Sequence, residues 1–399
     1  MEGTNMEENE NNTVLAEKSH KIERSREEKE VELARILMYA EERWDKKITE
    51  KKKEEEAVKI KKLRQKINAL DDRPMDESSL QKTSVRRVVG KAPESDKQKI
   101  LKWREAAFSD QKTEEGETPM SPEQIQIADM VNKATNEILQ KYGLPVFDIP
   151  PANIHVILKK YWKGQKFNSY YTQKHQKVVL KENGHLSDDL IKVFHEMLHF
   201  KSYGAAQILM GDEKLIQQYR TGLQITARNG ERDIFTNLNE AVTEEMTKKY
   251  VSKLLDNPLF KKEQDRTQKE KRKFQPSTME DVYYMENVDE QPMRNAIRRI
   301  FKMPEKKYSY YMAYSYENER ETLNTLIAKL FTKNPGKFKD ENEIMEMFEK
   351  AMLTGNILPI GRLIDTTFPK KTPEENGTFR QIGEMGEDTE GLKKFIEEL

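Results

Sequence analysis

The residues best placed to do chemistry in this chain are His195, Glu196 and His199, in the run His-Glu-Met-Leu-His. On a helix, residues four apart share one face, so the two imidazoles would aim at one point, where a zinc ion could bind. Glu196 is rotated from His195 by about a third of a turn, so it could reach a water on that ion without coordinating the ion itself. The run therefore predicts two metal ligands and one base.

A pair of acidic residues downstream, Glu240 and Glu244, has the same four-residue spacing in a segment with the pattern of a helix start. A catalytic zinc takes three protein ligands and keeps one position open, and two histidines with one glutamate are an established set. Glu240 is thus the candidate third ligand. Glu244, one turn later, could accept the ring N–H of a ligating histidine and fix its tautomer.

The His-Glu-x-x-His run and the later Asn239-Glu240-x-x-Thr243-Glu244 together resemble the motifs of the gluzincin zinc metallopeptidases, the thermolysin-like clan. The resemblance covers about residues 150–330. It implies that Glu240 is the third zinc ligand and that Glu244 supports a metal-bound histidine.

The metzincin pattern is excluded, because it requires glycine and histidine where this chain has Ser202 and Ala205. The spacing differs from that of thermolysin, since 40 residues lie between His199 and Glu240, about twice as many. An inserted hairpin explains the difference. Asn229-Gly230 is the strongest short-range hairpin signal in this interval, with strands expected at 223–227 and 233–235.

We expect an α+β, mainly helical fold with a small mixed sheet. Residues 1–118 would form a charged helical extension and linker, partly disordered. Residues 119–331 would form a zincin-like catalytic domain with a charged insertion near 257–307, and 332–399 a helical subdomain with a mobile end after 384.

Within the catalytic domain, Ser121-Pro122-Glu123-Gln124 has the form of a capping box and predicts a helix to about residue 142. Short apolar runs at 154–158 and 178–181 predict strands. The metal helix is expected at 188–203, with Ser187 as its N-cap and Gly204 as its stop. In the last part of the chain, Asp340 and Glu343 predict a second capping box and Gly355 a helix end.

Five tyrosines precede an apolar helix near residue 320; they are Tyr308, Tyr310, Tyr311, Tyr314 and Tyr316. Most tyrosines in such a segment pack their rings against apolar neighbours and leave their hydroxyl groups in contact with water. Gluzincins resemble one another in placing a tyrosine or histidine donor near the zinc after the third ligand. Tyr316 is the best candidate, because it enters the helix that carries Arg320, a second possible donor to a carboxylate or an oxyanion.

The resemblance implies peptide hydrolysis by a zinc-activated water, with Glu196 as general base and a peptide or protein as substrate. An extended substrate would pair with the edge of the sheet, expected near residues 178–180. One alternative is a catalytically inactive protein of zincin fold that binds partners through its N-terminal helix. Another is a helical interaction protein with an accidental motif, which would bind no metal.

Composition narrows the class of protein further. The chain has 70 basic and 70 acidic residues, so no net field favours nucleic acid or a membrane surface as a partner. It has no cysteine, which leaves histidine and carboxylate as the strong zinc ligands. Residues 1–12 are acidic with no apolar signal core, and no run reaches the roughly 18 apolar residues of a membrane span, so we expect a cytoplasmic protein.

Residues 18–70 are dense in charge, with apolar residues at intervals of three and four, the pattern of one or two amphipathic helices. Too few heptads are sustained for a confident coiled coil, so a solvated helix is favoured over a segment for a protein partner or self-association. The remaining histidines are not expected to bind zinc. His155 should be packed in a strand, and His20, His175 and His185 should be exposed.

Overall fold

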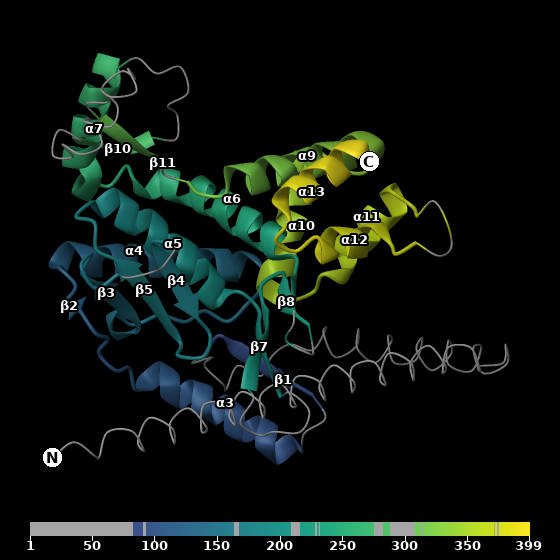
Figure 1. The fold of residues 1–399 in the computed structure, drawn as a ribbon, viewed down its shortest axis with the longest axis horizontal. Helices are drawn as coiled ribbons and strands as arrows, with labels where there is room; N and C mark the ends of the chain where they lie inside the picture. The colour runs from purple at the N-terminus through teal and green to yellow at the C-terminus, as the bar shows by residue number, and fades with distance from the viewer. Residues whose placement is uncertain are drawn as a thin grey trace, which may run out of the picture. The chain divides into compact units, whose positions relative to one another are not determined.

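Helices dominate the computed structural model, and the described residues also form three small sheets, so the expected α+β, mainly helical class is confirmed (Figure 1). The structure describes residues 83–90, 93–162, 167–208, 216–227, 230, 232–274, 282–287, 308–312, 314–370, 372 and 375–399. The helices predicted within 18–70, and His20, lie outside the described residues. No helix in these ranges is long and apolar enough to cross a membrane.

The four-stranded sheet has the order β2-β3-β5-β4. Its strands are β2 (Glu117–Thr118), β3 (Ile154–Ile157), β4 (Ser169–Thr172) and β5 (Lys177–Lys181). The strands predicted at 154–158 and 178–181 are β3 and β5, which pair in parallel. The expectation that 178–180 form the edge is wrong, because β4 pairs antiparallel with β5 on its other side. Among the described residues the edge strand next to β5 is β4, and the short strand β2 forms the opposite edge.

The five-stranded sheet has the order β1-β6-β7-β8-β9. Its strands are β1 (Val85–Val89), β6 (Gly204–Ile208), β7 (Ile216–Thr221), β8 (Gln224–Thr226) and β9 (Asp233–Ile234). The predicted hairpin is confirmed by the antiparallel pairing of β8 with β9. It fills only part of the interval between the metal helix and Glu240, which also holds β6 and β7.

Part of the predicted N-terminal linker is regular structure. β1 pairs in parallel with β6, and α3 (Glu94–Ser109) packs against β1. Val85, Val88 and Ile100 are buried in a small core with Ala206. Reading this stretch as linker therefore missed β1, because the strand bonds to a partner more than 100 residues away that no local pattern shows.

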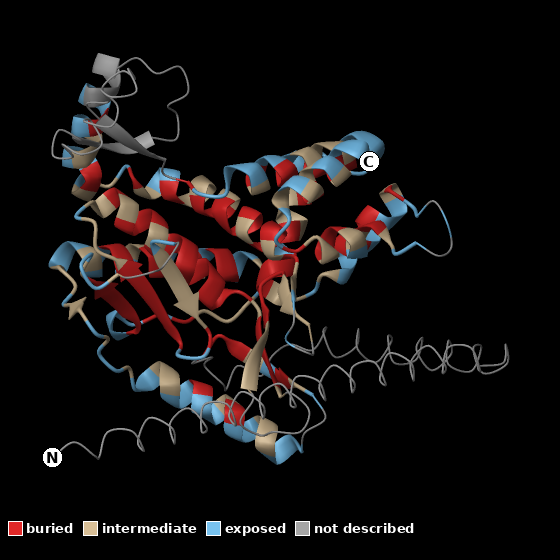
Figure 2. Cartoon of the chain, in the orientation of Figure 1, coloured by how far each residue is buried: buried red, intermediate tan, exposed pale blue. Residues whose placement is uncertain are grey.

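Helices α4 (Pro122–Lys141), α5 (Leu186–Lys201) and α6 (Thr236–Leu254) surround the larger core. The capping box that begins α4 is confirmed, since both Ser121 and Gln124 side chains bond to the backbone of the other residue. Figure 2 shows the buried residues concentrated on α5 and on the strands beside it. His155 in β3 is buried as expected and bonds to Glu117 and Gln111; His175 is exposed, and His185 is half-buried.

The last third of the chain adds a helical layer to the same core. Its elements are η2 (Pro258–Phe260), α7 (Lys261–Phe274), β10 (Val282–Asn287), β11 (Tyr308–Met312), α9 (Glu317–Lys333), α10 (Glu341–Thr354), α11 (Leu358–Thr367), α12 (Thr378–Glu384) and α13 (Thr389–Glu398); a further 3-10 turn, η1 (Pro151–Asn153), precedes β3.

Two details of this layer differ from what the sequence predicts. The end of the chain was expected to be mobile, but α13 packs on α9 and buries Leu392 and Ile396. Asp340 caps α10, but the Glu343 side chain accepts from the N–H of Lys339 instead of that of Asp340, so the capping box is incomplete. Gly355 ends α10 in a left-handed conformation, as predicted.

Helix α5 begins two residues before its predicted start, and Ser187 is not its N-cap. Glu263 of α7 caps it instead, because its two carboxylate oxygens accept from the backbone N–H groups of Leu186 and Ser187 at 2.8 and 2.9 Å. At the other end, the Arg86 guanidinium donates to the carbonyl of Lys201 at 3.3 Å. A carboxylate at the N-terminus and a cation at the C-terminus both stabilise a helix.

Replacing the Glu263 carboxylate should therefore destabilise the fold. We expect Glu263→Ala to lower the free energy of unfolding by about 1–2 kcal/mol, as for loss of a helix cap. Urea unfolding followed by circular dichroism measures the change, and Asp265→Ala, an exposed acid on the same helix, is the control. Equal stability of the two variants would contradict the capping role.

Candidate metal centre

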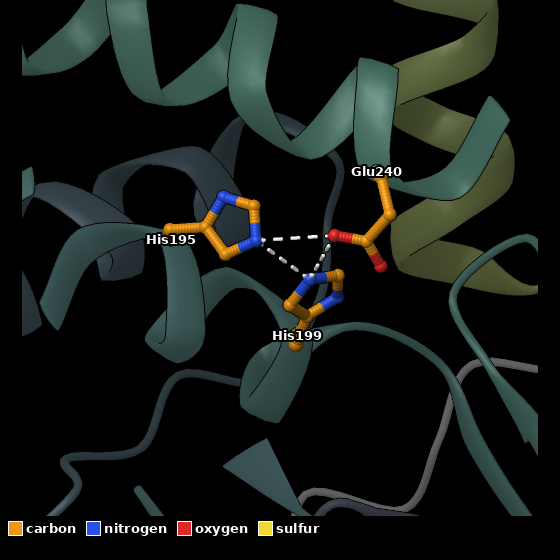
Figure 3. A group of neighbouring side chains, drawn as sticks. All are labelled: His195, His199 and Glu240. Carbon is orange, nitrogen blue, oxygen red and sulfur yellow. Dashed lines mark hydrogen bonds and ion pairs between the residues drawn. The ribbon is translucent and has the colours of Figure 1, made fainter. Parts of the chain in front are cut away.

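Three side chains from two helices converge on one point, shown in Figure 3. The Nε2 atoms of His195 and His199 are 3.0 Å apart, and each lies 3.3 Å from Oε2 of Glu240. Ligands about 2.1 Å from a tetrahedral zinc ion would stand about 3.4 Å apart. The structure thus brings the three predicted ligands together at the spacing that one such ion requires.

Packing of α5 against α6 positions these residues. On α5, Phe194, Met197 and Leu198 are fully buried, which turns the histidines on the remaining face toward α6. On α6, Leu238, Val242 and Met246 recur every four residues and form a buried stripe. The acidic residues Glu240 and Glu244 lie on the face that meets α5.

Glu244 orients one of the imidazoles. Its Oε2 lies 2.6 Å from Nδ1 of His195, and its Oε1 accepts from the backbone N–H of Ser315 at 2.6 Å. Nδ1 is therefore occupied, and Nε2 is left to face Glu240 and His199. The structure places Glu244 where the sequence analysis expected a supporting carboxylate.

The pKa directions in this cluster follow from its burial and its carboxylates. Burial lowers the pKa of His195, but Glu244 and Glu240 outweigh it and raise that pKa well above its usual value. Burial raises the pKa of Glu240, but the two imidazoles outweigh it and hold that pKa well below its usual range. Two buried imidazoles and one half-buried, ionised carboxylate are a donor set that fits zinc.

The second imidazole, His199, contacts the asparagine of the downstream motif. Nδ1 of His199 lies 3.4 Å from Nδ2 of Asn239, whose Oδ1 accepts from the N–H of Leu223 at 2.8 Å. Gly222 makes room for this asparagine: its φ is +60°, and a Cβ there would stand 2.4 Å from Asn239 Oδ1. The turn between β7 and β8 therefore supports His199 of the candidate metal centre through Asn239.

Glu196, the predicted base, is buried beside the ligands and is held by a residue that the sequence analysis missed. The Ser169 hydroxyl donates to its Oε1 at 2.7 Å. Ser169 lies at the start of the edge strand β4, so the candidate base is fixed from the sheet. Nothing in the sequence around Ser169 indicates this contact, because it depends on how β4 meets α5.

Tyr316 stands on the other side of His195. The two rings are nearly parallel, with centroids 5.9 Å apart, and Tyr316 has the left-handed φ of 57° just before α9. Burial and the charges of Glu240 and Glu196 raise the pKa of its hydroxyl, so this group remains a proton donor at neutral pH. A left-handed tyrosine is strained, which is typical of functional positions.

Arg320, the second oxyanion donor considered from the sequence, contacts Glu245 and Tyr314 instead of the histidine cluster. Its Nε donates to Oε1 of Glu245 at 2.8 Å, and its guanidinium lies over the ring of Tyr314. The arginine therefore joins α9 to α6. Of the two proposed donors, Tyr316 is the one that contacts the histidine cluster.

Removing the charge of Glu244 should weaken metal binding. We expect Glu244→Gln to lower zinc affinity by about 10- to 100-fold, as for other residues that orient a metal-bound histidine. Competition with a chromophoric chelator measures the affinity. Glu245→Gln, the next residue on the helix, is the control, and equal affinities in the two variants would contradict the orienting role.

No protein-family model, curated protein or solved structure matches this chain. The geometry of the metal centre is therefore the basis for inferring a function.

Proposed function

We propose that this chain is a zinc-dependent peptidase of the gluzincin type. The observation that carries the proposal is the convergence of His195, His199 and Glu240, with Glu196 beside them and Glu244 behind His195. A zinc ion held by these three ligands would lower the pKa of a bound water to about 7 and polarise the substrate carbonyl.

Residues of the chain account for the proton transfers and for stabilising the negative charge that develops on the substrate carbonyl. Glu196 takes a proton from the attacking water and gives it to the leaving amine, so the peptide bond breaks and the water is divided between the two products. The hydrogen bond from the Ser169 hydroxyl to Oε1 would hold the Glu196 carboxylate in place during this exchange. The Tyr316 hydroxyl donates a hydrogen bond to the oxyanion that develops on the substrate carbonyl.

The edge strand β4 is the part of the sheet on which an extended substrate can pair. Ser169, its first residue, contacts Glu196, and β5 is its partner on the other side. A peptide that adds to this edge would form main-chain hydrogen bonds beside the base. We therefore infer that the substrate pairs with β4, in place of the strand at 178–180 considered from the sequence.

Glu196→Gln separates metal binding from catalysis. We expect it to retain zinc and to lose cleavage of susceptible peptides by about 100- to 10,000-fold, because general base catalysis contributes that much. Cleavage of a mixed peptide library followed by mass spectrometry, with zinc content measured in parallel, tests this. Glu137→Gln, on the surface of α4, is the control.

Two outcomes would count against the proposal. Cleavage by Glu196→Gln at the wild-type rate would remove Glu196 from the role of base. Stoichiometric zinc in the wild type with no cleavage of any peptide would favour the binding protein of zincin fold instead.

Tyr316→Phe tests the oxyanion donor. We expect kcat to fall by about 100-fold with little change in KM or zinc affinity, because the lost hydrogen bond forms only in the transition state. Steady-state kinetics on a cleaved peptide measure both constants. Tyr250→Phe, on α6, is the control, and an equal kcat for the two variants would exclude Tyr316 as a donor.

A further inference from the structure

A groove of about 700 Å³ lies on the side of the β4–β5 hairpin that faces away from α5. Alternate residues of β4 point to opposite faces. Ser169 and Tyr171 face α5, where they contact Glu196 and the ring of Phe200. The other residues of the strand, Tyr170 and Thr172, line the groove together with Trp103 and Ala107 of α3 and with His175 and Lys177.

The groove and the candidate catalytic centre share the edge strand. Ser169 at one end of β4 contacts the base, and Thr172 stands about 10 Å further along, at about 3.3 Å per residue. A peptide pairing antiparallel to β4 would run from Thr172 toward Ser169 in its own N-to-C direction. The part of the peptide that lies over the groove would then be N-terminal to the cleaved bond. Every second side chain of that part would point into the groove.

Exposed aromatic side chains gather around this part of β4. Trp103 in the wall of the groove is 66% exposed, and Phe167, 47% exposed, packs edge-on against Tyr170 at 5.5 Å. Trp162 contacts the same tyrosine at 6.0 Å. Large exposed apolar side chains that cluster mark an interaction surface, whereas single ones do not.

The wall of the groove holds Lys112 and Lys177 against Asp110 and Glu114, and Lys177 pairs with Glu114. The excess of positive charge comes from Lys174, which is exposed beside the groove next to His175. Burial lowers the pKa of His175, and Lys177, Lys174 and Arg104 lower it further, whereas Glu114 raises it.

The segment that carries Trp162 adds more positive charge, since Lys159 and Lys160 are exposed. A side chain entering the groove therefore meets aromatic walls and an excess of cations. An anionic side chain complements this environment.

We propose that this groove is a substrate subsite that takes an acidic side chain two to four residues N-terminal to the cleaved bond. The inference rests on the proposed peptidase function and names the class of peptide that such an enzyme would prefer. Aspartate or glutamate at these positions gains the attraction of Lys112 and Lys174, and an extended backbone on β4 holds it there.

Peptides that share one cleaved sequence, with glutamate, alanine or lysine at each of these positions, test the subsite. We expect kcat/KM to be about 10-fold higher with glutamate than with lysine at low salt, mainly through KM, and the difference to shrink as salt is added. The double variant Lys112→Glu with Lys174→Glu should remove or reverse the preference. Lys133→Glu with Lys262→Glu, two exposed lysines outside the groove, is the matched control and should retain it.

A binding measurement distinguishes failure of the subsite from failure of the peptidase function. Fluorescence anisotropy of the labelled glutamate and lysine peptides on the zinc-loaded Glu196→Gln protein needs no cleavage. Tighter binding of the glutamate peptide, lost when the charges of Lys112 and Lys174 are reversed, supports the subsite even if the wild type cleaves nothing. Equal binding of both peptides, or a preference unchanged in the double variant, would overturn it.

Discussion

A buried contact between a carboxylate and an imidazole holds the site together. Glu244 of α6 and His195 of α5 lie 2.6 Å apart, and both are almost fully removed from water. Burying a charge is costly unless the charge is paired and its hydrogen bonds are made. Glu244 meets this condition with two donors, His195 on α5 and the backbone N–H of Ser315. Three segments distant in sequence therefore meet at one carboxylate.

This contact has consequences on both sides of His195. Because Nδ1 faces Glu244, Nε2 faces His199 and Glu240, which is the orientation that a shared ion needs. Because Ser315 also bonds to Glu244, the next residue, Tyr316, is brought against the other face of the same ring. The caps on both ends of α5 then fix the helix along its axis. The candidate ligands and the candidate donor are thus positioned by one set of contacts.

The features that the sequence predicted well are those encoded within a few residues. Three such features are the four-residue spacing of His195 and His199, the capping box at Ser121 and the turn at Gly230. Each depends on neighbours in the chain, and each has the expected local structure. Glu240 was found because its motif repeats the same spacing on a second helix.

The features that were missed depend on pairing between distant segments. β1 has no strong apolar pattern, and its parallel partner is β6, so the segment resembled a linker. The order of strands, which makes β4 the edge, cannot be read from β4 or β5 alone. Ser169 and Glu263 act on α5 from other elements, and each is an ordinary polar residue in its own segment. The sequence therefore indicated which three side chains come together, but not the residues that support them.

X-ray absorption at the zinc edge, on the purified chain with one equivalent of zinc, tests the central claim most directly. The account predicts one tightly held zinc per chain, with two imidazole nitrogens and a carboxylate oxygen at about 2.0–2.2 Å, and loss of the carboxylate in Glu240→Ala. A protein that retains no zinc while folded, or a zinc ion with the same ligands after Glu240→Ala, would contradict it.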